Sequence, residues 1–469
     1  MFERSKTKSL GWLAYMLAGA FLLSSSGCRS LPPPEQELSY PSYLTLKPTD
    51  RLLVLAPHPD DEVLGCGGVI QEAVSQGLPV RVVFLTYGDN NELSFIRYRK
   101  RPVLMPKAVR AMGELRHEEA LKAADLLGLS RSQLTFLGYP DWGTFPIWCL
   151  HWGSRPAYRS MLTHVRAVPY PDAFRPGAPY KAEAVLADLE SLLREFKPTK
   201  VFVSHPADSH PDHRACYLYT RVALWDLQQE LRPKLYPYLV HYSRWPRPDK
   251  DPLHQTLVPP PSLNQLLWRS YPLSSEQATR NLEALKAHAS QYRFSPRSMA
   301  NLIRLNELFG DYYSVALRGP ESGLVQDPSL LLDEIPENLS KEEQAAFVRV
   351  EWRSVRIEGT DLVLTLEFSK PLAKEVSASI YLFGYRVGRP FSEMPKLHIR
   401  VGLFRYQVYD QNRRLSAKTV SILRNRKRIT VRVPLEALGN PQKILSSAHT
   451  TLGEISLDWA SWRVLELTD

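Results

Sequence analysis

Two short loops of this 469-residue chain carry residues that could do chemistry together. The first holds His58, Asp60 and Asp61 within the run HPDDE, and the second ends at His213 within the run DSHPDH. His58 and Asp61 are three residues apart, so a chain that begins to turn there directs both side chains the same way. With His213 they form a set of two histidines and one carboxylate, which suits Zn²⁺ and leaves a coordination position for water. We therefore expect one zinc ion per chain, although the same ligands accept Fe²⁺ and other divalent ions.

The residues beside these ligands complete a hydrolytic site. A metal lowers the pKa of its bound water toward neutrality and so produces a nucleophile for an amide or ester carbonyl. Asp60 is not needed as a ligand, so it is placed to take the proton of that water and pass it to the leaving group. His210 could hold the tetrahedral oxyanion as an imidazolium, with Asp212 fixing its ring and its charge state. Each loop alone could be a turn in which Pro and Asp are present because they suit the backbone conformation. Two such loops, each after an apolar run, favour a catalytic metal site instead.

The elements that must position these loops are short apolar runs alternating with helical segments. RLLVLA precedes HPDDE, KVFVS precedes the second loop, and EVLGCGGVIQEAVSQG and EAVLADLESLLREF have helical apolar spacing. This order predicts a Rossmann-like α/β domain over residues 49–320, with a parallel sheet covered on both faces. Sites of such sheets lie at the carboxyl ends of the strands, where HPDDE, TYGDNN, GYPDWG and SHPADSHPDH all fall.

Two stretches interrupt the alternation and are expected to be insertions around the site. The first, residues 90–112, contains RYRKRP, and the second, residues 142–181, is rich in proline. The second also carries eight large aromatic side chains, namely Trp142, Phe145, Trp148, Trp152, Tyr158, Tyr170, Phe174 and Tyr180. Long loops are often functional lids, and an aromatic one can stack on a sugar ring. A self-packed loop that covers the edge of the sheet is the equal alternative.

The last part of the chain differs in pattern and charge. Runs of alternating apolar and polar residues predict an all-β, sandwich-like accessory domain over residues 345–469. From residue 341 onward there are 21 basic and 14 acidic residues, so this part holds most of the net charge of +10. The basic run of Arg424, Arg426, Lys427 and Arg428 could hold an anionic glycan, but a solvated edge strand or turn is the more common role. No zinc finger, basic zipper or aromatic RNA-binding signature is present, so we expect no nucleic-acid partner.

The N-terminus has the pattern of an export signal over residues 1–28. Basic residues precede an apolar run that is shorter than the roughly 20 residues needed to span a bilayer. The run ends in SSSGC, which resembles a bacterial lipoprotein cleavage box and makes Cys28 the expected lipidation site. Simple secretion and an anchor that is retained uncleaved are the alternatives, because Ser25 stands where the box usually has Leu. We expect a Pro-rich linker over residues 29–48 and an exported, membrane-anchored protein that faces the periplasm or the cell exterior.

The motifs of the α/β part resemble the PIG-L/LmbE-like de-N-acetylases, which include the N-acetylglucosaminyl-phosphatidylinositol, mycothiol-pathway and bacillithiol-pathway deacetylases. The resemblance covers roughly residues 50–300 and implies a Rossmann-like fold. It rests on APHPDDEVLGCGG, FLTYGD, the pattern R-x-E-E-A that begins at Arg116, FLGYPD and DSHPDHRA.

The resemblance implies a role for each matching residue. The zinc ligands fall on His58, Asp61 and His213, the general base on Asp60 and the oxyanion-stabilising histidine on His210. Arg116 and Asp141 are implied to contribute to the substrate pocket, although each could instead be an ion-pair partner or a turn residue. His288, in KAHASQ, matches a family-like tail, and the sequence suggests no more for it than a core or surface histidine.

The sequence as a whole predicts a zinc-dependent hydrolase that removes N-acetyl groups from an N-acetylglucosamine-containing glycan or glycoconjugate outside the cytoplasm. Its composition, 44% hydrophobic and 23% charged, excludes a mainly disordered chain. The expected substrate is an acetamido sugar in a glycolipid or polysaccharide. One alternative is an amidase or esterase acting on another acylated substrate. A non-catalytic glycan-binding lipoprotein is a second alternative, which the complete set of ligands, Asp60 and His210 counts against.

Overall fold

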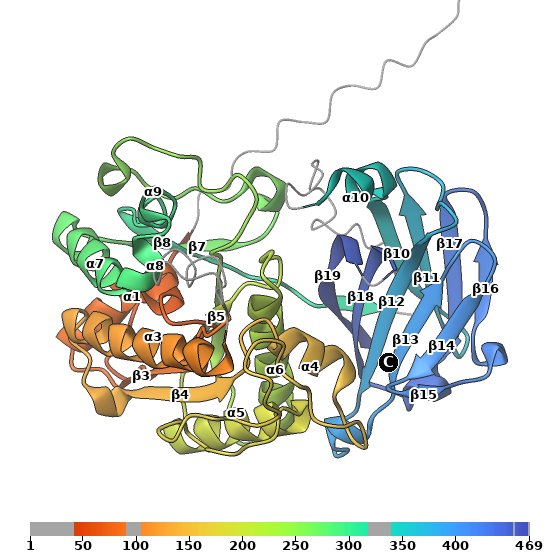
Figure 1. Cartoon of the computed structure of the whole chain (residues 1–469), viewed down its shortest axis with the longest axis horizontal. Coiled ribbons are helices and arrows are strands. Elements are labelled where there is room, and N and C mark those ends of the chain that lie inside the picture. The colour runs from red at the N-terminus through yellow and green to blue at the C-terminus, as the bar shows by residue number, and fades with distance from the viewer. Residues whose placement is uncertain (1–41, 91–104, 318–338, 454, 468–469) are drawn as a thin grey trace, which may run out of the picture. The chain divides into compact units, whose positions relative to one another are not determined.

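The computed structural model describes residues 42–90, 105–317, 339–453 and 455–467 (Figure 1). The expected export signal, Cys28 and most of the expected linker lie outside these residues. Within the described part of the chain, no helix combines the length and the apolar character needed to cross a lipid bilayer.

An eight-stranded sheet forms the centre of the α/β part. In spatial order its strands are β1 (Ser42–Tyr43), β7 (Trp268–Pro272), β8 (Asn306–Gly310), β6 (Lys234–Tyr238), β5 (Lys200–Ser204), β2 (Leu52–Ala56), β3 (Val80–Thr86) and β4 (Leu134–Tyr139). The five strands β6, β5, β2, β3 and β4 run parallel, whereas β8 is antiparallel to both of its neighbours. The sheet is therefore mixed and rich in parallel pairs, rather than fully parallel as expected.

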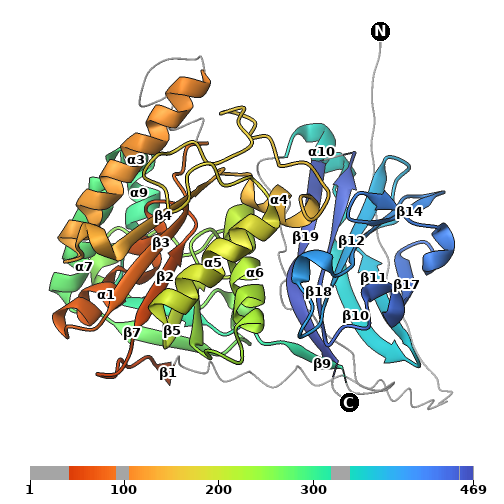
Figure 2. The same cartoon turned by 90° about the horizontal axis from the view of Figure 1, so that it is seen from below.

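Helices cover both faces of this sheet (Figures 1 and 2). One face carries α1 (Asp61–Ser75), α3 (Pro106–Leu126), α7 (Ser275–Ala287) and the short helices α8 (Ala289–Tyr292) and α9 (Pro296–Ala300). The other face carries α4 (Thr144–Leu150), α5 (Ala182–Phe196) and α6 (Pro211–Asp226). Short 3₁₀ helices in this part are η1 (Arg131–Gln133), η2 (Pro252–His254) and η3 (Pro261–Leu263). With both faces covered, strand β2 is buried along its whole length, which explains its unbroken apolar sequence.

Two of the expected boundaries shift. Residues 42–44 join the sheet instead of the linker, because β1 pairs with β7 and the buried Leu44 donates its N–H to the carbonyl of Ser270 at 2.9 Å. The first insertion is partly helical, because α3 begins at Pro106 and includes the residues up to 112. Proline at the first position of a helix is favourable because its fixed φ suits the helix and its missing N–H is not needed there. The remainder of that insertion, 91–104, lies outside the described residues.

Most aromatic side chains of the second insertion point into the protein. Trp148 of α4 and Trp152 just after it are fully buried. Their rings lie 5.7 and 5.1 Å from the ring of Phe391 in the C-terminal part. Trp142, by contrast, is 49% exposed. The self-packed alternative therefore describes most of this insertion, while Trp142 remains available to a ligand.

The C-terminal part consists of two β-sheets that share a buried apolar cluster. The smaller sheet has the order β10 (Val350–Glu358), β11 (Asp361–Phe368), β17 (Arg428–Pro434) and β16 (Ser421–Arg424), all antiparallel. The larger has the order β15 (Arg413–Arg414), β14 (Tyr406–Asp410), β13 (Lys396–Val401), β12 (Val376–Tyr385), β18 (Lys443–Leu452), β19 (Ile455–Leu467) and β9 (Val315–Leu317). Short helices are α10 (Lys341–Ala346), η5 (Phe391–Glu393), η6 (Ala417–Thr419) and η7 (Leu435–Leu438). The expected β-rich region is thus present, and the segment that precedes it contributes β9, which pairs in parallel with β19.

The basic run of this part forms an exposed hairpin turn. Residues 424–428 connect the edge strand β16 to β17, and all five are exposed. Lys427 donates from Nζ to the carbonyl of Ser369 at 2.9 Å, and Arg428 pairs with Glu367. These contacts agree with the edge-strand alternative, in which charge keeps an open sheet edge soluble.

Candidate metal centre and active site

The first loop of the site is a tight turn between β2 and α1. The chain leaves the buried strand at Ala56, and α1 begins at Asp61. Between them Asp60 has φ 125° and ψ −27°, a backbone conformation that residues with a side chain rarely adopt. Such strain costs about 1–3 kcal/mol and persists only where the surroundings hold it, which is common at active sites. The acidic side chains of Asp61 and Glu62 lie in the first turn of α1, where the helix dipole favours negative charge.

One carboxylate oxygen of the first loop contacts a histidine nitrogen of each loop. Asp61 Oδ2 lies 3.2 Å from His58 Nδ1 and 3.1 Å from His213 Nε2. All three side chains are buried, and Asp61 Oδ1 has no hydrogen-bond partner among the residues that the structure describes. Ligands of one tetrahedral zinc ion at ordinary bond lengths stand ~3.3 Å apart, close to these separations. Among the described residues, His58 with His210 and His213, and Asp61 with His213 and His241, have ligand atoms close enough together to hold one ion. The cluster therefore fits a divalent metal ion, and the ligand set of His58, Asp61 and His213 stays a prediction.

Each of the two histidines is backed by a carboxylate on its other ring nitrogen. His58 Nε2 lies 3.1 Å from Asp141 Oδ1 and 3.3 Å from Asp212 Oδ2, and His213 Nδ1 lies 3.2 Å from Asp208 Oδ2. A carboxylate behind a metal-binding histidine fixes its orientation and strengthens it as a ligand. Asp141 thus contacts a metal ligand, in addition to lining the cavity described below.

Burial and charge oppose each other at these groups. Burial acts to lower the pKa of His213, but Asp208 and Asp61 outweigh it and raise the pKa to about 9. Burial acts to raise the pKa of Asp61, but His213 and His58 outweigh it and hold the pKa well below its usual value. Buried groups of opposite charge therefore face each other at short range in this centre. A divalent cation would take the place of the protons on the two histidines, since metal ligands bind in their deprotonated forms.

Asp60 is held beside this centre by its neighbours. Its Oδ2 lies 3.2 Å from Arg116 Nη2, and its backbone N–H donates to Glu62 Oε2 at 2.9 Å. Glu62 is fully buried, and its Oε1 lies 2.8 Å from Nε2 of the equally buried His288. Burial raises the pKa of Asp60 to about 6, with Arg116 acting against the rise. A carboxylate with a pKa near neutrality suits a general base.

Arg116 braces the loop that carries Asp60. Arg116 is only 3% exposed. Its guanidinium donates to the carbonyls of Gly88 at 2.9 Å and Pro59 at 2.6 Å. A Cβ on Gly88 would lie 2.1 Å from Arg116 Nη1, so the motif TYGD needs glycine there, where φ is also +65°. The arginine that the sequence assigned to the substrate pocket thus uses two of its donors on the backbone of the site.

His210 and Asp212 differ from their expected arrangement. His210 caps the N-terminus of α6, and its Nδ1 accepts the backbone N–H of Asp212 at 3.2 Å. That bond requires an unprotonated Nδ1, so the neutral ring carries its proton on Nε2, and burial holds the pKa of His210 well below its usual value. An imidazolium, as expected from the sequence, does not fit this bond. The Asp212 carboxylate does not fix the ring of His210 as expected. It accepts from the backbone N–H groups of Trp142 at 2.6 Å and Thr144 at 3.2 Å.

A cavity of about 440 Å³ opens onto these groups, and we call it the catalytic pocket. The predicted site residues that line it are His58, Asp60, Arg116, Asp141 and His210. Trp142 also lines it, with its ring 4.4 Å from the ring of His210. Asp61, Asp212 and His213 lie behind this surface. The structure thus brings together the eight candidate residues that the sequence assigned to metal, catalysis and substrate.

Three further residues of the site were missed or given no role from the sequence. Asp208 joins the loops, since its Oδ2 accepts the N–H of His241 at 2.9 Å while facing His213. His241 follows strand β6, and its ring lies 4.7 Å from that of His213, where it could offer a further ligand. His288 supports Asp60 through Glu62. A signal existed for Asp208, which stands inside the quoted motif DSHPDH, whereas His241 follows a strand that was not predicted and had no such signal.

Comparison with known proteins supports the family resemblance. The sequence model of the PIG-L family, GlcNAc-PI de-N-acetylase, matches residues 53–224. The chain is 34% identical over 201 residues to a 1D-myo-inositol 2-acetamido-2-deoxy-alpha-D-glucopyranoside deacetylase of Saccharopolyspora erythraea, covering 40% of this chain and 58% of that protein. It is 23% identical to a probable N-acetyl-alpha-D-glucosaminyl L-malate deacetylase of Bacillus anthracis, covering 53% of this chain and 84% of that one.

A solved structure also aligns with part of the chain. N,N'-diacetylchitobiose deacetylase from Pyrococcus horikoshii aligns with 21% identity and a TM-score of 0.34, over 55% of this chain and 82% of its own. The chain spans little more than half the length of the first of the curated relatives above. The resemblance inferred from the motifs is confirmed over residues 53–224, which match the PIG-L family model.

Proposed function

We propose that this protein is a metal-dependent hydrolase, with zinc as the preferred ion, that removes N-acetyl groups from an N-acetylglucosamine-containing glycan or glycoconjugate. The observation that carries this proposal is the contact of Asp61 Oδ2 with both His58 Nδ1 and His213 Nε2, with Asp60 at the adjoining pocket. Two curated relatives are named as deacetylases of acetamido-sugar compounds, which supports hydrolysis of an N-acetyl amide bond.

The residues of the site divide the work of amide hydrolysis. A divalent ion held by His58, Asp61 and His213 would supply Lewis acidity and an activated water. Asp60 takes a proton from the attacking water and delivers it to the leaving amine. His210, neutral with its proton on Nε2, donates a hydrogen bond to the oxygen that gains charge as the carbonyl is attacked. Arg116 keeps Asp60 in place through its bonds to the loop.

We also propose that the protein acts outside the cytoplasm, anchored to a membrane by a lipid on Cys28, with a C-terminal β-sandwich as an accessory domain. Support for export and anchoring comes from the sequence of residues 1–28. Support for the sandwich is the buried cluster that draws residues from both C-terminal sheets. Mass spectrometry of the N-terminal peptide tests the anchor, since a diacylglyceryl group on Cys28 is expected and an unmodified cysteine would overturn it.

The proposed activity is tested by metal content and acetate release together. We expect about one divalent ion per chain and chelator-sensitive acetate release from N-acetylglucosamine oligomers or glycolipids. Asp60→Asn should keep the metal and lose hydrolysis, whereas His213→Ala should lose both. The matched control is His254→Ala, because that histidine is exposed and its ring pairs with Asp251, outside the site. Bound metal without acetate release from any acetamido sugar would refute the deacetylase assignment.

A further inference from the structure

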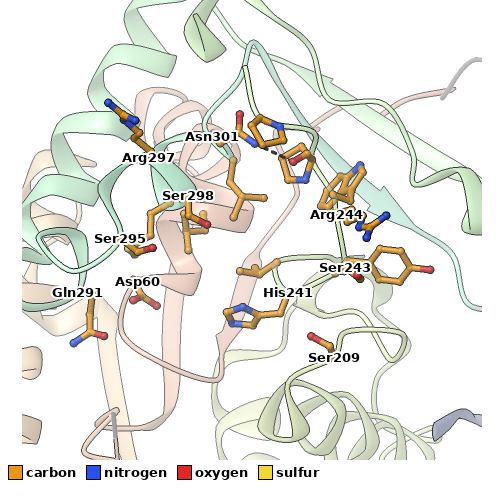
Figure 3. Close-up of a pocket in the computed structure, with 18 of the residues that line it drawn as sticks. Asp60, Ser209, His241, Ser243, Arg244, Gln291, Ser295, Arg297, Ser298 and Asn301 are labelled. Atoms are coloured by element: carbon orange, nitrogen blue, oxygen red, sulfur yellow. Dashed lines mark hydrogen bonds between the residues drawn. The ribbon is translucent and has the colours of Figure 1, made fainter. Parts of the chain in front are cut away.

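The site borders a second, larger cavity, which we call the loop cleft. It has a volume of about 760 Å³ and shares Asp60, His241 and Gln291 with the catalytic pocket. Figure 3 shows Asp60 and Gln291 on one side of this space and His241 on the other. Each of the two cavities is large enough for a small-molecule ligand. A substrate that reaches Asp60 from the catalytic pocket therefore has room to continue into the loop cleft.

The walls of the loop cleft are tied to each other. One wall is the loop 240–248 that follows β6, and the other is the segment 291–302 with α8 and α9. Asn301 Nδ2 donates to the carbonyl of Pro246 at 3.0 Å, and Asn301 Oδ1 accepts the N–H of Asp249 at 3.0 Å. Arg304 adds a bond to the same loop. A cleft held in this way needs little ordering when a ligand binds.

The lining offers the groups that recognise sugars. Hydroxyl side chains come from both walls, with Ser243 facing Ser295 and Ser298 across the space, and Ser209 from the loop before α6 lies on the side of Ser243 (Figure 3). Such hydroxyls both donate and accept, as sugar hydroxyls require. Aromatic rings are contributed by Tyr242, Trp245 and Phe294. Aromatic faces beside polar groups are suited to sugar rings, which have apolar faces and hydroxylated edges.

The charge of the loop cleft is positive. Arg244 and Arg297 come from opposite walls (Figure 3), and Asp60 is the sole carboxylate among the described lining residues. Arg244 has φ 53°, in the left-handed region that favours glycine, so the fold holds an arginine in a strained position. Guanidinium groups pair well with carboxylates and phosphates. This lining favours a ligand that carries a negative charge.

We propose that the loop cleft binds the part of the substrate next to the acetamido sugar, and that this part is a further sugar unit of an anionic oligosaccharide. The inference rests on the proposed deacetylase function and names its substrate class. A substrate of at least two sugar units, with an acidic group near the rim of the cleft, fills both cavities, whereas a single acetamido sugar fills one.

The length of the substrate is tested with N-acetylglucosamine monomer and tetramer. Ser298→Trp places a large side chain on the exposed wall of the cleft. We expect it to lower the ratio of kcat/KM for tetramer to that for monomer by about tenfold or more, and to weaken tetramer binding by calorimetry to a similar extent. Ser275→Trp, on an exposed serine at the start of α7, is the matched control and should change neither. An unchanged ratio and unchanged binding in Ser298→Trp would overturn the proposal.

The charge of the substrate is tested by binding of a neutral N-acetylglucosamine dimer and of the disaccharide of N-acetylglucosamine and N-acetylmuramic acid, which carries one carboxylate. Arg244→Gln and Arg297→Gln should each weaken binding of the acidic disaccharide about two- to fivefold relative to the neutral dimer. Arg293→Gln, an exposed arginine outside the lining, is the control. Equal loss for both probes would overturn the anionic class. Binding of the tetramer in the cleft without acetate release would refute the proposed function while upholding the cleft.

Discussion

Glu62 offers a direct test of how the fold holds the proposed general base. Its carboxylate accepts the backbone N–H of Asp60 at 2.9 Å and lies 2.8 Å from His288 Nε2, and all three residues are buried. Asp60 itself has the strained φ of 125°. Two variants separate the contributions of shape and hydrogen bonding. Glu62→Gln keeps the shape and one acceptor oxygen for Asp60, whereas Glu62→Met removes both acceptors.

The expected size of the effect follows from these contacts. In Glu62→Met the Asp60 N–H and the His288 ring lose their buried acceptor, and each unsatisfied group costs about 1–3 kcal/mol of unfolding free energy. The bond to Asp60 also opposes the backbone strain, so its loss lets the loop relax. If the free energy that favours the productive position of Asp60 falls by about 1.5–3 kcal/mol, that position becomes roughly ten- to a hundredfold rarer. We expect kcat to fall by the same factor. Glu62→Gln should keep most of the unfolding free energy and most of kcat, since its amide oxygen can still accept the N–H of Asp60.

Acetate release, urea unfolding and metal content measured on the same preparations decide the outcome. The prediction is a fall in kcat with metal content near the wild-type value, because Glu62 acts on Asp60 and not on the ligands. Wild-type kcat in a destabilised Glu62→Met would show that Glu62 supports the fold alone. A parallel loss of metal would show that the effect passes through Asp61, the next residue in the chain. Either result would refute the reasoning given above.

Three further predictions follow from the site. Asp208→Asn should weaken metal binding about 10- to 100-fold, because it removes the charge behind His213; equal affinity in a chelator competition would contradict this. Trp142→Ala should raise KM about two- to tenfold by removing an aromatic face beside His210, whereas Phe174→Ala, another partly exposed aromatic of the insertion, should not. Burial raises the pKa of Asp60 to about 6, and the base acts as the anion, so kcat/KM should fall as the pH drops through that value. A cation bound nearby would move this fall to a lower pH, because it favours the charged carboxylate. A pH profile that is flat between pH 4 and 7 would contradict the assignment of Asp60 as the base.

The convergence of the two motif loops could be predicted because it depends on local patterns. His58 and His213 each follow an apolar run, and the alternation of strands and helices indicates parallel strands whose carboxyl ends meet. In the structure β2 and β5 are direct neighbours, which brings both loops to the same edge. The spacing of His58 and Asp61 across a helix start was likewise visible in the sequence.

Partnerships between distant segments could not be predicted in the same way. Glu62 and His288 are 226 residues apart, and neither lies in a pattern that names its partner. The strand before His241 contains lysine, proline and tyrosine instead of an apolar run, so its position in the sheet was not visible. The antiparallel direction of β8 also depends on the path of the long connection between β7 and β8. The periodicity of that connection does not indicate in which direction the chain re-enters the sheet.

The aromatic insertion shows why composition alone left two alternatives open. Tryptophan serves equally well in a core and on a ligand-binding surface, so its position is decided by what the rest of the chain places beside it. Here Trp148 packs between Tyr219 of α6 and Phe383 of the C-terminal part. The same helix α4 starts at Thr144, whose N–H binds the Asp212 carboxylate that also contacts His58. The C-terminal β-sheets therefore support the metal centre indirectly, because they bury the helix whose N-terminus holds the carboxylate behind a metal ligand.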